Sequence, residues 1–188
     1  MRNQSRNKTK HLALLGLFAA LILVLGLTPV GMIPLGFINL TTLHIPVVVG
    51  TLVLGLSDGL VLGAFFGAVS LYKALTSTTA LVAPLLGQSV LLVIVMCFVP
   101  RLLVPLVTDL VYRLLKGKKA GVTVSAVCGS LTNTVFYLGM MLAFYVLCGI
   151  DAAAVLALIG GTGLLGGTGE AILCGILATP IVAALKRT

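Results

Sequence analysis

The chain has 188 residues, of which 60% are hydrophobic and 9% are charged, and its formal net charge is +8. Soluble domains carry about 25% charged residues, so this composition excludes an ordinary soluble domain and indicates a polytopic protein of the lipid bilayer. At about 20 residues per span, the length allows roughly six spanning helices and leaves no room for a folded soluble domain. We therefore expect an all-α membrane protein with one integral domain over residues 1–188, made of a basic N-terminus (1–10) and a six-helix bundle (11–187).

The distribution of basic residues predicts the orientation of the chain. Eleven of the twelve Lys and Arg residues fall into three groups, which are Arg2, Arg6, Lys8 and Lys10; Arg101, Arg113, Lys116, Lys118 and Lys119; and Lys186 and Arg187. By the positive-inside rule all three groups lie in the cytoplasm, which predicts cytoplasmic N- and C-termini. Basic residues gathered at helix ends also argue against nucleic acid as a partner. Lys73 stands outside the three groups.

The first predicted helix runs from residue 11 to 27 and ends at Thr28-Pro29. Ala13, Gly16 and Ala20 recur at i, i+3 and i+7, which gives this helix one face of small side chains. Such a face lets another helix approach closely, either inside the bundle or on a partner.

A polar stretch follows within residues 37–46, after an irregular outer segment at 30–40. It contains Asn39, Thr41, Thr42 and His44 in a sequence that otherwise suits lipid. Hydrocarbon offers no hydrogen bonds, so such groups face protein, a partner or a water-filled cavity. We interpret them as lining a small-molecule pocket. The alternative is that the amide and hydroxyls cap a helix start and that the imidazole is an interfacial histidine with its hydrogen bonds satisfied.

The next two predicted helices are short, at residues 42–56 and 59–75, with a turn at Ser57-Asp58-Gly59. A single long helix with Asp58 buried at its middle is the alternative. Two crossings bring every basic group to the same side, so the charge bias favours two helices. Glycine recurs at positions 55, 59, 63 and 67, which predicts close packing of the second of these helices against a neighbour.

The second half of the chain continues the pattern of apolar runs and polar loops. The predicted elements are an outer loop at 72–83, a helix at 84–107 bent near Pro100 and Pro105, a helix at 120–147, a short outer helix at 152–159 and a last helix that ends at Lys186. The Gly-rich repeats at 160–163 and 166–169 have no lysine of the phosphate-loop type after them. We expect them to form a broken or mobile helix entry beside a cavity.

This topology brings polar residues of five segments to the outer half of the bundle. The candidate substrate-binding residues are Asn39, Thr42, His44, Lys73, Gln88, Asn133, Tyr137 and Glu170. These residues offer one lysine, one carboxylate, amides and hydroxyls. Such a set of groups can bind a small polar molecule with an anionic end. For Glu170 the alternative is a structural contact with Lys73 or Asn133, and for Lys73 it is an anchor at lipid headgroups. The pattern contains no pair of nucleophile and base and no metal-ligand spacing, so we expect no catalysis, cofactor or metal.

Three runs carry a resemblance to a known family. They are Thr-Thr-Leu-His-Ile-Pro-Val-Val-Val-Gly at 41–50, Ser-Leu-Thr-Asn-Thr at 130–134, and Glu-Ala-Ile at 170–172 ahead of Pro-Ile-Val at 180–182. With the six-span layout, they resemble the substrate-capture (S) component of an energy-coupling factor (ECF) vitamin transporter over residues 13–185. Among these proteins the chain is most similar to the pantothenate-specific members.

The resemblance implies a vitamin-binding cavity that opens outward and is closed by two outer loops. It also implies partners, namely a transmembrane coupling subunit and two cytoplasmic ATPase subunits that hydrolyse ATP. In the family an Ala-x-x-x-Ala pattern on the first helix contacts the coupling subunit, and here it falls on Gly16 and Ala20, on the same face as Ala13.

Three functions remain open at this point. The first is a high-affinity capture subunit of an ATP-driven importer for pantothenate. The second is an S component for another B vitamin or precursor, such as pyridoxine or hydroxymethylpyrimidine. The third is a stand-alone proton-coupled secondary transporter with Glu170 or His44 as the proton relay.

Overall fold

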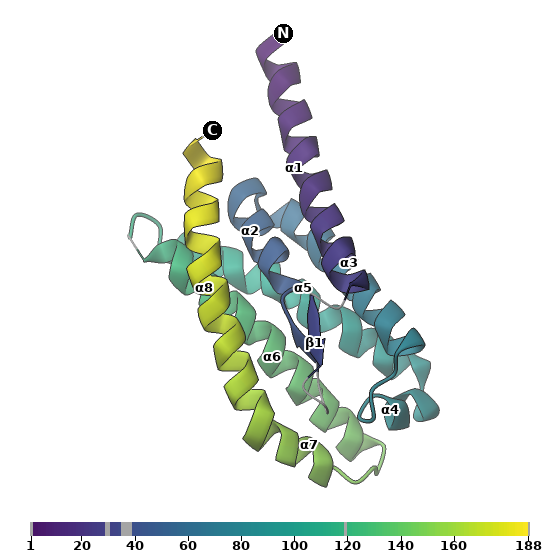
Figure 1. Cartoon of the computed structure of the whole chain (residues 1–188). Coiled ribbons are helices and arrows are strands. Elements are labelled where there is room, and N and C mark those ends of the chain that lie inside the picture. Colours follow the sequence, from purple (N-terminus) through teal and green to yellow (C-terminus); the bar gives the residue numbers. More distant parts are fainter. Residues whose placement is uncertain (1, 29–30, 35–38, 119, 188) are drawn as a thin grey trace.

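The computed structural model describes residues 2–28, 31–34, 39–118 and 120–187, and it is almost entirely helical (Figure 1). The elements are α1 (Arg2–Leu27), β1 (Met32–Pro34), β2 (Asn39–Thr41), α2 (His44–Leu54), α3 (Leu56–Thr76), α4 (Ala83–Gln88), α5 (Val90–Leu114), α6 (Gly121–Leu147), α7 (Ala153–Leu158), the π-helical turn η1 (Ile159–Gly163) and α8 (Leu164–Arg187). The predicted all-α class is confirmed, with one short antiparallel hairpin of β1 and β2 between α1 and α2. Part of the irregular segment predicted at 30–40, including Phe37 and Ile38 of the polar stretch, lies outside the described residues.

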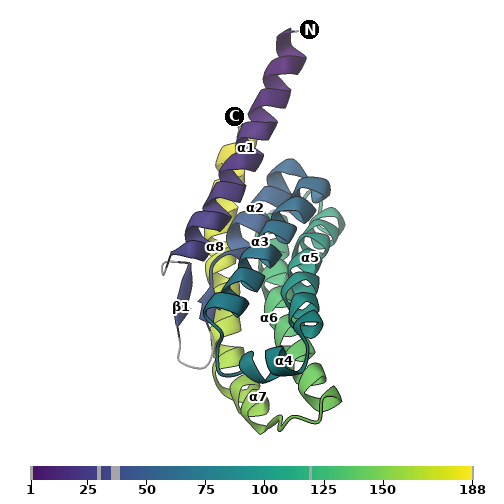
Figure 2. The ribbon, with the colours of Figure 1, turned by 90° about the vertical axis from the view of Figure 1, so that its right-hand side faces the viewer.

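The helices form one elongated bundle with both chain ends at the same end of it (Figure 1, Figure 2). The short helices α4 and α7 lie at the opposite end. Five of the described helices, α1, α3, α5, α6 and α8, are long and apolar enough to cross a membrane. The sixth predicted span corresponds to α2, which has 11 residues. At about 1.5 Å per residue this helix is roughly half as long as the ~30 Å hydrocarbon layer.

The chain forms two helices, α2 and α3, where one long helix was the alternative. The break lies at Gly55, whose φ of 106° is available to glycine at little cost. The predicted turn at Ser57-Asp58-Gly59 is therefore wrong by a few residues, because the earlier glycine makes the turn. Asp58 instead lies in the first turn of α3, where a carboxylate is favoured by the helix dipole, and it is 3.0 Å from His11 Nε2.

The glycine spacing on α3 does serve close packing, against α5. A Cβ at Gly63 would lie 2.7 Å from the backbone oxygen of Arg101, and one at Gly67 would lie 2.8 Å from the ring of Phe98. These distances are below normal contact, so only glycine lets the two helix backbones approach this closely.

The helix predicted at 84–107 is divided in the structure. It breaks at Ser89 into α4 and α5, and α5 then continues through Pro100 and Pro105 as far as Leu114. The predicted helix at 120–147 is confirmed as α6, and a short helix, α7, lies within the predicted range 152–159. The first Gly-rich repeat forms most of η1, and the second lies in the first turns of α8.

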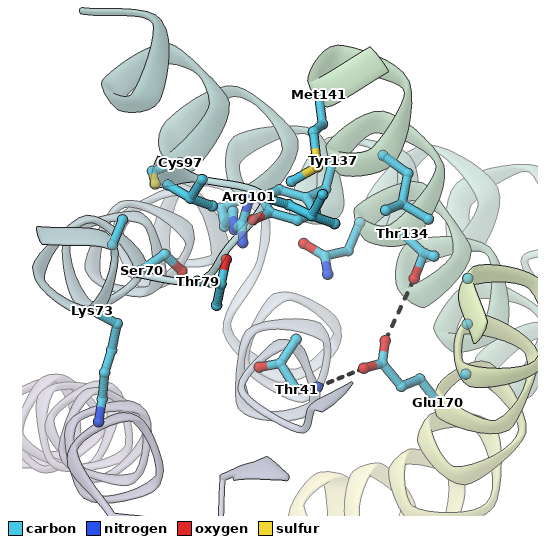
Figure 3. Close-up of a pocket in the computed structure, with 18 of the residues that line it drawn as sticks. Thr41, Ser70, Lys73, Thr79, Cys97, Arg101, Thr134, Tyr137, Met141 and Glu170 are labelled. Atoms are coloured by element: carbon cyan, nitrogen blue, oxygen red, sulfur yellow. Dashed lines mark hydrogen bonds between the residues drawn. The ribbon is translucent and has the colours of Figure 1, made fainter. Parts of the chain in front are cut away.

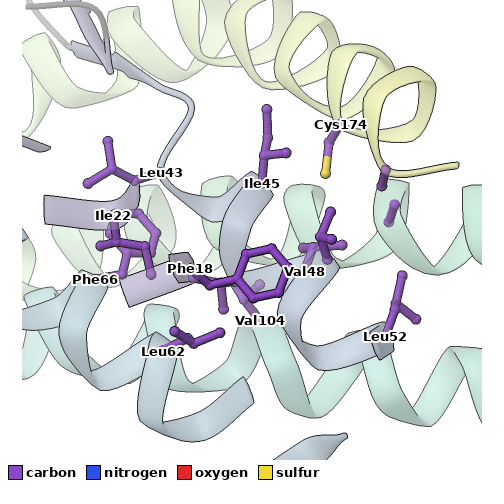
Figure 4. Packing of buried hydrophobic residues seen from close by; sticks show 14 of the residues in the cluster. Phe18, Ile22, Leu43, Ile45, Val48, Leu52, Leu62, Phe66, Val104 and Cys174 are labelled. Carbon is purple, nitrogen blue, oxygen red and sulfur yellow. The ribbon is translucent and has the colours of Figure 1, made fainter. Parts of the chain in front are cut away.

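Two apolar clusters hold the bundle together. One joins α1, α2, α3 and α8 and includes Phe18, Val48, Phe66 and Cys174 (Figure 4). The other joins the loop before α4 to α5, α6 and α7 at the end of the bundle opposite the termini.

Candidate functional site

A cavity of about 120 Å³ lies between the two apolar clusters. Its wall is formed by β2, α3, the loop after α3, α5, α6, η1 and α8, so it draws on most of the chain. The polar residues that line it are Thr41, Ser70, Lys73, Ser77, Thr79, Arg101, Asn133, Thr134, Tyr137 and Glu170. In Figure 3 the side chains of Lys73, Arg101 and Glu170 lie on three sides of this space.

Arg101 is the residue that the sequence analysis placed wrongly. It was assigned to a cytoplasmic basic group, but it lies in the interior of α5, its side chain is 7% exposed, and it lines the cavity. The reason is that α5 continues past Pro100, so the chain does not leave the membrane region there. A signal was present in the sequence, since Arg101 stands in an apolar run about three helical turns before Arg113.

The Arg101 guanidinium is held by two rings and one carbonyl group. Its Cζ lies 5.2 Å from the ring centroid of Phe66 and 4.5 Å from that of Tyr137, and its Nη1 donates a 2.9 Å hydrogen bond to the backbone oxygen of Met96. Aromatic faces attract a cation but leave its charge uncompensated. Arg101 forms no ion pair with a carboxylate of the described residues, unlike Arg113, which pairs with Asp109. The cavity therefore contains a buried cation without a direct acidic partner among the described residues.

Glu170 is anchored on the other side of the cavity. Its Oε1 accepts a 2.6 Å hydrogen bond from the backbone N–H of Thr41, and its Oε2 accepts a 3.4 Å hydrogen bond from the hydroxyl of Thr134 (Figure 3). The carboxylate thereby joins α8 to β2 and α6. Neither contact proposed from the sequence as an alternative, with Lys73 or with Asn133, is among the contacts of Glu170 in the described structure.

Two other polar groups of the lining have unused hydrogen-bonding capacity. Asn133 is 4% exposed, and its Oδ1 has no hydrogen-bond partner among the described residues. The same holds for the hydroxyl of Ser70, which lines the cavity from α3. Buried polar groups are normally paired, because an unpaired one costs about 1–3 kcal/mol. These two atoms are consequently candidates for contact with a bound molecule.

Of the eight substrate-binding candidates from the sequence, the structure brings four together around the cavity, namely Lys73, Asn133, Tyr137 and Glu170. Three others, Thr42, His44 and Gln88, do not line it, and the side chain of Asn39 lies outside the described part of the structure. His44 is 1% exposed and its Nε2 lies 3.0 Å from the hydroxyl of Ser130, inside the bundle. Gln88 is exposed at the end of α4.

The last two of these candidates belong to the segment between α1 and α2. Thr42 donates hydrogen bonds from its backbone N–H and its hydroxyl to the backbone oxygen of Gly31. Asn39 is paired with Pro34 in the β1–β2 hairpin. Thr41, between them in the chain, lines the cavity, and its backbone N–H donates a hydrogen bond to Glu170.

The small-residue face of α1 lies outside the bundle. Ala13, Gly16 and Ala20 are all exposed, and a Cβ at Gly16 would have no described atom within 4 Å apart from its own helix. This face therefore does not serve packing within the described part of the chain, which was one of its two predicted roles.

A family model for the substrate-specific component of ECF transporters matches residues 10–185, nearly the whole chain. The chain belongs to this family. A pantothenic acid transporter, PanT, of Lactococcus lactis subsp. cremoris is 29% identical to this ECF component over 97% of this chain and 96% of its own length. A pantothenate transporter, also PanT, of Leuconostoc mesenteroides is 32% identical over 62% of this chain and 58% of its own length.

The family membership and the apolar helices together identify a multi-pass protein of the bacterial plasma membrane. It is the substrate-specific component of a transporter, so the cavity between its helices is the candidate substrate site. Arg101 and Glu170 then supply opposite charges at that site, and Asn133 and Ser70 supply hydrogen-bonding groups.

Proposed function

We propose that this substrate-specific component captures pantothenate outside the cell and delivers it to an ATP-driven importer. The observation that carries the proposal is the buried Arg101 guanidinium, which lines the cavity without an acidic partner among the described residues. An Arg guanidinium binds a carboxylate through two parallel hydrogen bonds. Both relatives described above are named as transporters of pantothenate.

The charge of the cavity suits this ligand. Lys73 and Arg101 supply two positive charges and an ionised Glu170 supplies one negative charge, so the lining has a surplus of one positive charge. Pantothenate carries a single carboxylate. This positive surplus favours entry of the carboxylate into the partly apolar interior of the bundle, where electrostatic attraction is less screened than in water.

The other groups of pantothenate also have counterparts. The molecule has one amide, two hydroxyls and a pair of methyl groups in addition to the carboxylate. The unpaired oxygens of Asn133 and Ser70, and the carboxylate of Glu170, can bond its hydroxyls and amide N–H. Leu138 and Met141 offer apolar surface to the methyl groups. With the carboxylate at Arg101, the hydroxyl end of the ligand lies toward Glu170.

For transport, the component needs partners. We infer a transmembrane coupling subunit and two cytoplasmic ATPase subunits, with the exposed face of Ala13, Gly16 and Ala20 as the contact with the coupling subunit. Close approach of helices in a membrane requires such small side chains. From the remaining basic residues of the three groups, without Arg101, we infer that both termini lie in the cytoplasm and that the cavity faces outside, with α2 as the short sixth crossing.

A binding screen tests the substrate. The purified protein is titrated by calorimetry and by thermal shift with pantothenate, pyridoxine and hydroxymethylpyrimidine. We expect pantothenate alone to bind and to raise the melting temperature, because a ligand that binds only the folded state stabilises it. Binding of pyridoxine or hydroxymethylpyrimidine in its place refutes the assignment to pantothenate.

A reconstitution experiment separates the capture subunit from a stand-alone secondary transporter. Liposomes that contain this chain alone, under an imposed proton gradient, are compared with liposomes that also contain the coupling and ATPase subunits with internal ATP. We expect uptake of labelled pantothenate only in the second case. Uptake by the chain alone under the gradient contradicts the capture-subunit proposal.

The orientation is tested by labelling single cysteines placed at Lys73 and Arg113 after the four native cysteines have been replaced by alanine. Lys73 is near the end of α3 and Arg113 near the end of α5, and these two helices run in opposite directions along the bundle. A membrane-impermeant maleimide is expected to reach Lys73→Cys in intact cells and Arg113→Cys only after lysis. Labelling of both from the outside overturns the orientation.

A further inference from the structure

The contact that holds Arg101 depends on a missing hydrogen bond in α5. In an α-helix the backbone N–H of each residue donates to the carbonyl four residues earlier. Pro100 has no N–H, so the carbonyl of Met96 lacks its regular donor inside α5. The Arg101 Nη1 occupies that position and donates to the Met96 oxygen at 2.9 Å.

A proline inside a helix also displaces the carbonyl that it leaves unpaired. Its ring clashes with the carbonyl oxygen four residues earlier and turns it away from the helix axis. The Met96 oxygen can thereby be reached by a side chain on the helix surface. Long side chains of a helix lean toward its N-terminus, which is the direction from Arg101 back to Met96.

This hydrogen bond defines where the guanidinium lies. With Nη1 held at Met96, the planar group lies against the rings of Phe66 on α3 and Tyr137 on α6. Its Nε has no partner among the described residues. The side chain lines the cavity, so it meets an entering ligand with its orientation already set.

We propose that Pro100 is a positioning residue for substrate selectivity: by leaving the Met96 carbonyl free, it fixes the Arg101 guanidinium in the orientation that receives a ligand carboxylate. This inference rests on the proposed function, since it assigns the carboxylate of pantothenate to Arg101. A group fixed before binding loses less conformational freedom on binding, so the effect is specific to ligands that use the guanidinium.

The test compares pantothenate with pantothenol, the neutral analogue that has an alcohol in place of the carboxylate. Pro100→Ala supplies an N–H at position 100, which pairs with the Met96 carbonyl and draws it away from Arg101. Alanine is also the better helix former, so we expect the variant to fold. Pro100→Ser supplies the same N–H and serves as a second variant. Pro180→Ala is the matched control, because Pro180 also lies inside a spanning helix but is exposed and does not line the cavity.

We expect calorimetry to show a loss of about tenfold in pantothenate affinity for Pro100→Ala, the size of a weakened hydrogen bond to a charged group. Pantothenol affinity stays within about twofold of wild type, as expected for a ligand that does not use the charge. Pro180→Ala leaves both affinities unchanged. An equal loss for both ligands, or an unchanged preference for pantothenate, overturns the inference and leaves the proposed function intact.

A double-mutant cycle with Arg101→Met shows whether Pro100 acts through Arg101. If it does, Pro100→Ala changes pantothenate affinity in the wild-type background and has no further effect in the Arg101→Met background. Additive losses in the double variant overturn the inference. Failure of the wild-type protein to bind pantothenate at all is a different outcome, which refutes the proposed function and the inference with it.

Discussion

The carboxylate of Glu170 on α8 accepts a 2.6 Å hydrogen bond from the backbone N–H of Thr41, 129 residues earlier in the chain. Thr41 ends β2, so this bond fastens the β1–β2 hairpin to the helix bundle at the wall of the cavity. The same carboxylate is a candidate partner for the hydroxyl groups of a ligand. Glu170 is therefore shared between the attachment of the hairpin and the candidate substrate site.

Replacement of Glu170 by alanine is expected to weaken pantothenate binding at least about tenfold while the protein still folds. The change removes a charged acceptor for the ligand and leaves the Thr41 N–H without its partner. Calorimetry gives the affinity, and size-exclusion chromatography with circular dichroism checks the fold. Glu170→Gln keeps an oxygen for Thr41 and should lose less affinity. Wild-type affinity in the alanine variant removes Glu170 from the site.

Asn133→Ala is expected to weaken pantothenate binding by about 1–3 kcal/mol, because the variant removes a hydrogen bond between the amide and the ligand. The side chain is buried at the cavity with an unpaired Oδ1, so its removal deletes a ligand contact without breaking a bond of that oxygen within the described protein. Thr132→Ala is the control on the same helix. The hydroxyl of Thr132 donates a hydrogen bond to the backbone oxygen of Cys128 within α6, and the residue does not line the cavity. Equal affinities of the two variants contradict a role for Asn133.

Gly63→Ala is expected to lower both the stability and the pantothenate affinity. The added methyl would lie 2.7 Å from the Arg101 backbone oxygen, so α3 must move away from α5, at a cost of about 1–3 kcal/mol. Phe66, one turn further along α3, then moves away from the guanidinium. Thermal unfolding and calorimetry measure the two effects. Gly139→Ala is the control, because a Cβ there meets no described atom within 4 Å outside its own helix, and an equal drop in that variant speaks against the packing explanation.

Gly16→Leu is expected to spare substrate binding and to abolish uptake. The leucine side chain fits the open space on α1 but prevents a second helix from approaching this face. Gly139→Leu introduces the same side chain at an exposed glycine of α6 and should leave uptake intact. The measurements are calorimetric affinity of the isolated chain and uptake by the reconstituted transporter. Normal uptake in Gly16→Leu shows that the coupling subunit docks elsewhere.

Several features could be predicted from sequence because their causes are local. Apolar runs of sufficient length specify α1, α6 and α8 wherever they are placed, since hydrocarbon requires every backbone group to be paired within the segment. Isolated polar residues in such runs are costly in lipid, which pointed to eight candidates, and four of them, Lys73, Asn133, Tyr137 and Glu170, line the cavity.

Other features were decided only by tertiary structure. Counting charges along the chain assigns Arg101 to a cytoplasmic group. Its real position inside the bundle follows from two facts of the structure: α5 continues past Pro100, and it packs on the glycines of α3. Likewise, the sequence places His44 in a polar stretch, but the orientation of α2 in the bundle decides that its imidazole meets Ser130 and not the cavity. Composition and periodicity determine that this chain is a helical membrane protein with a polar interior site. Which side chains form that site is decided by contacts between helices, because each such contact depends on residues that are far apart in the sequence.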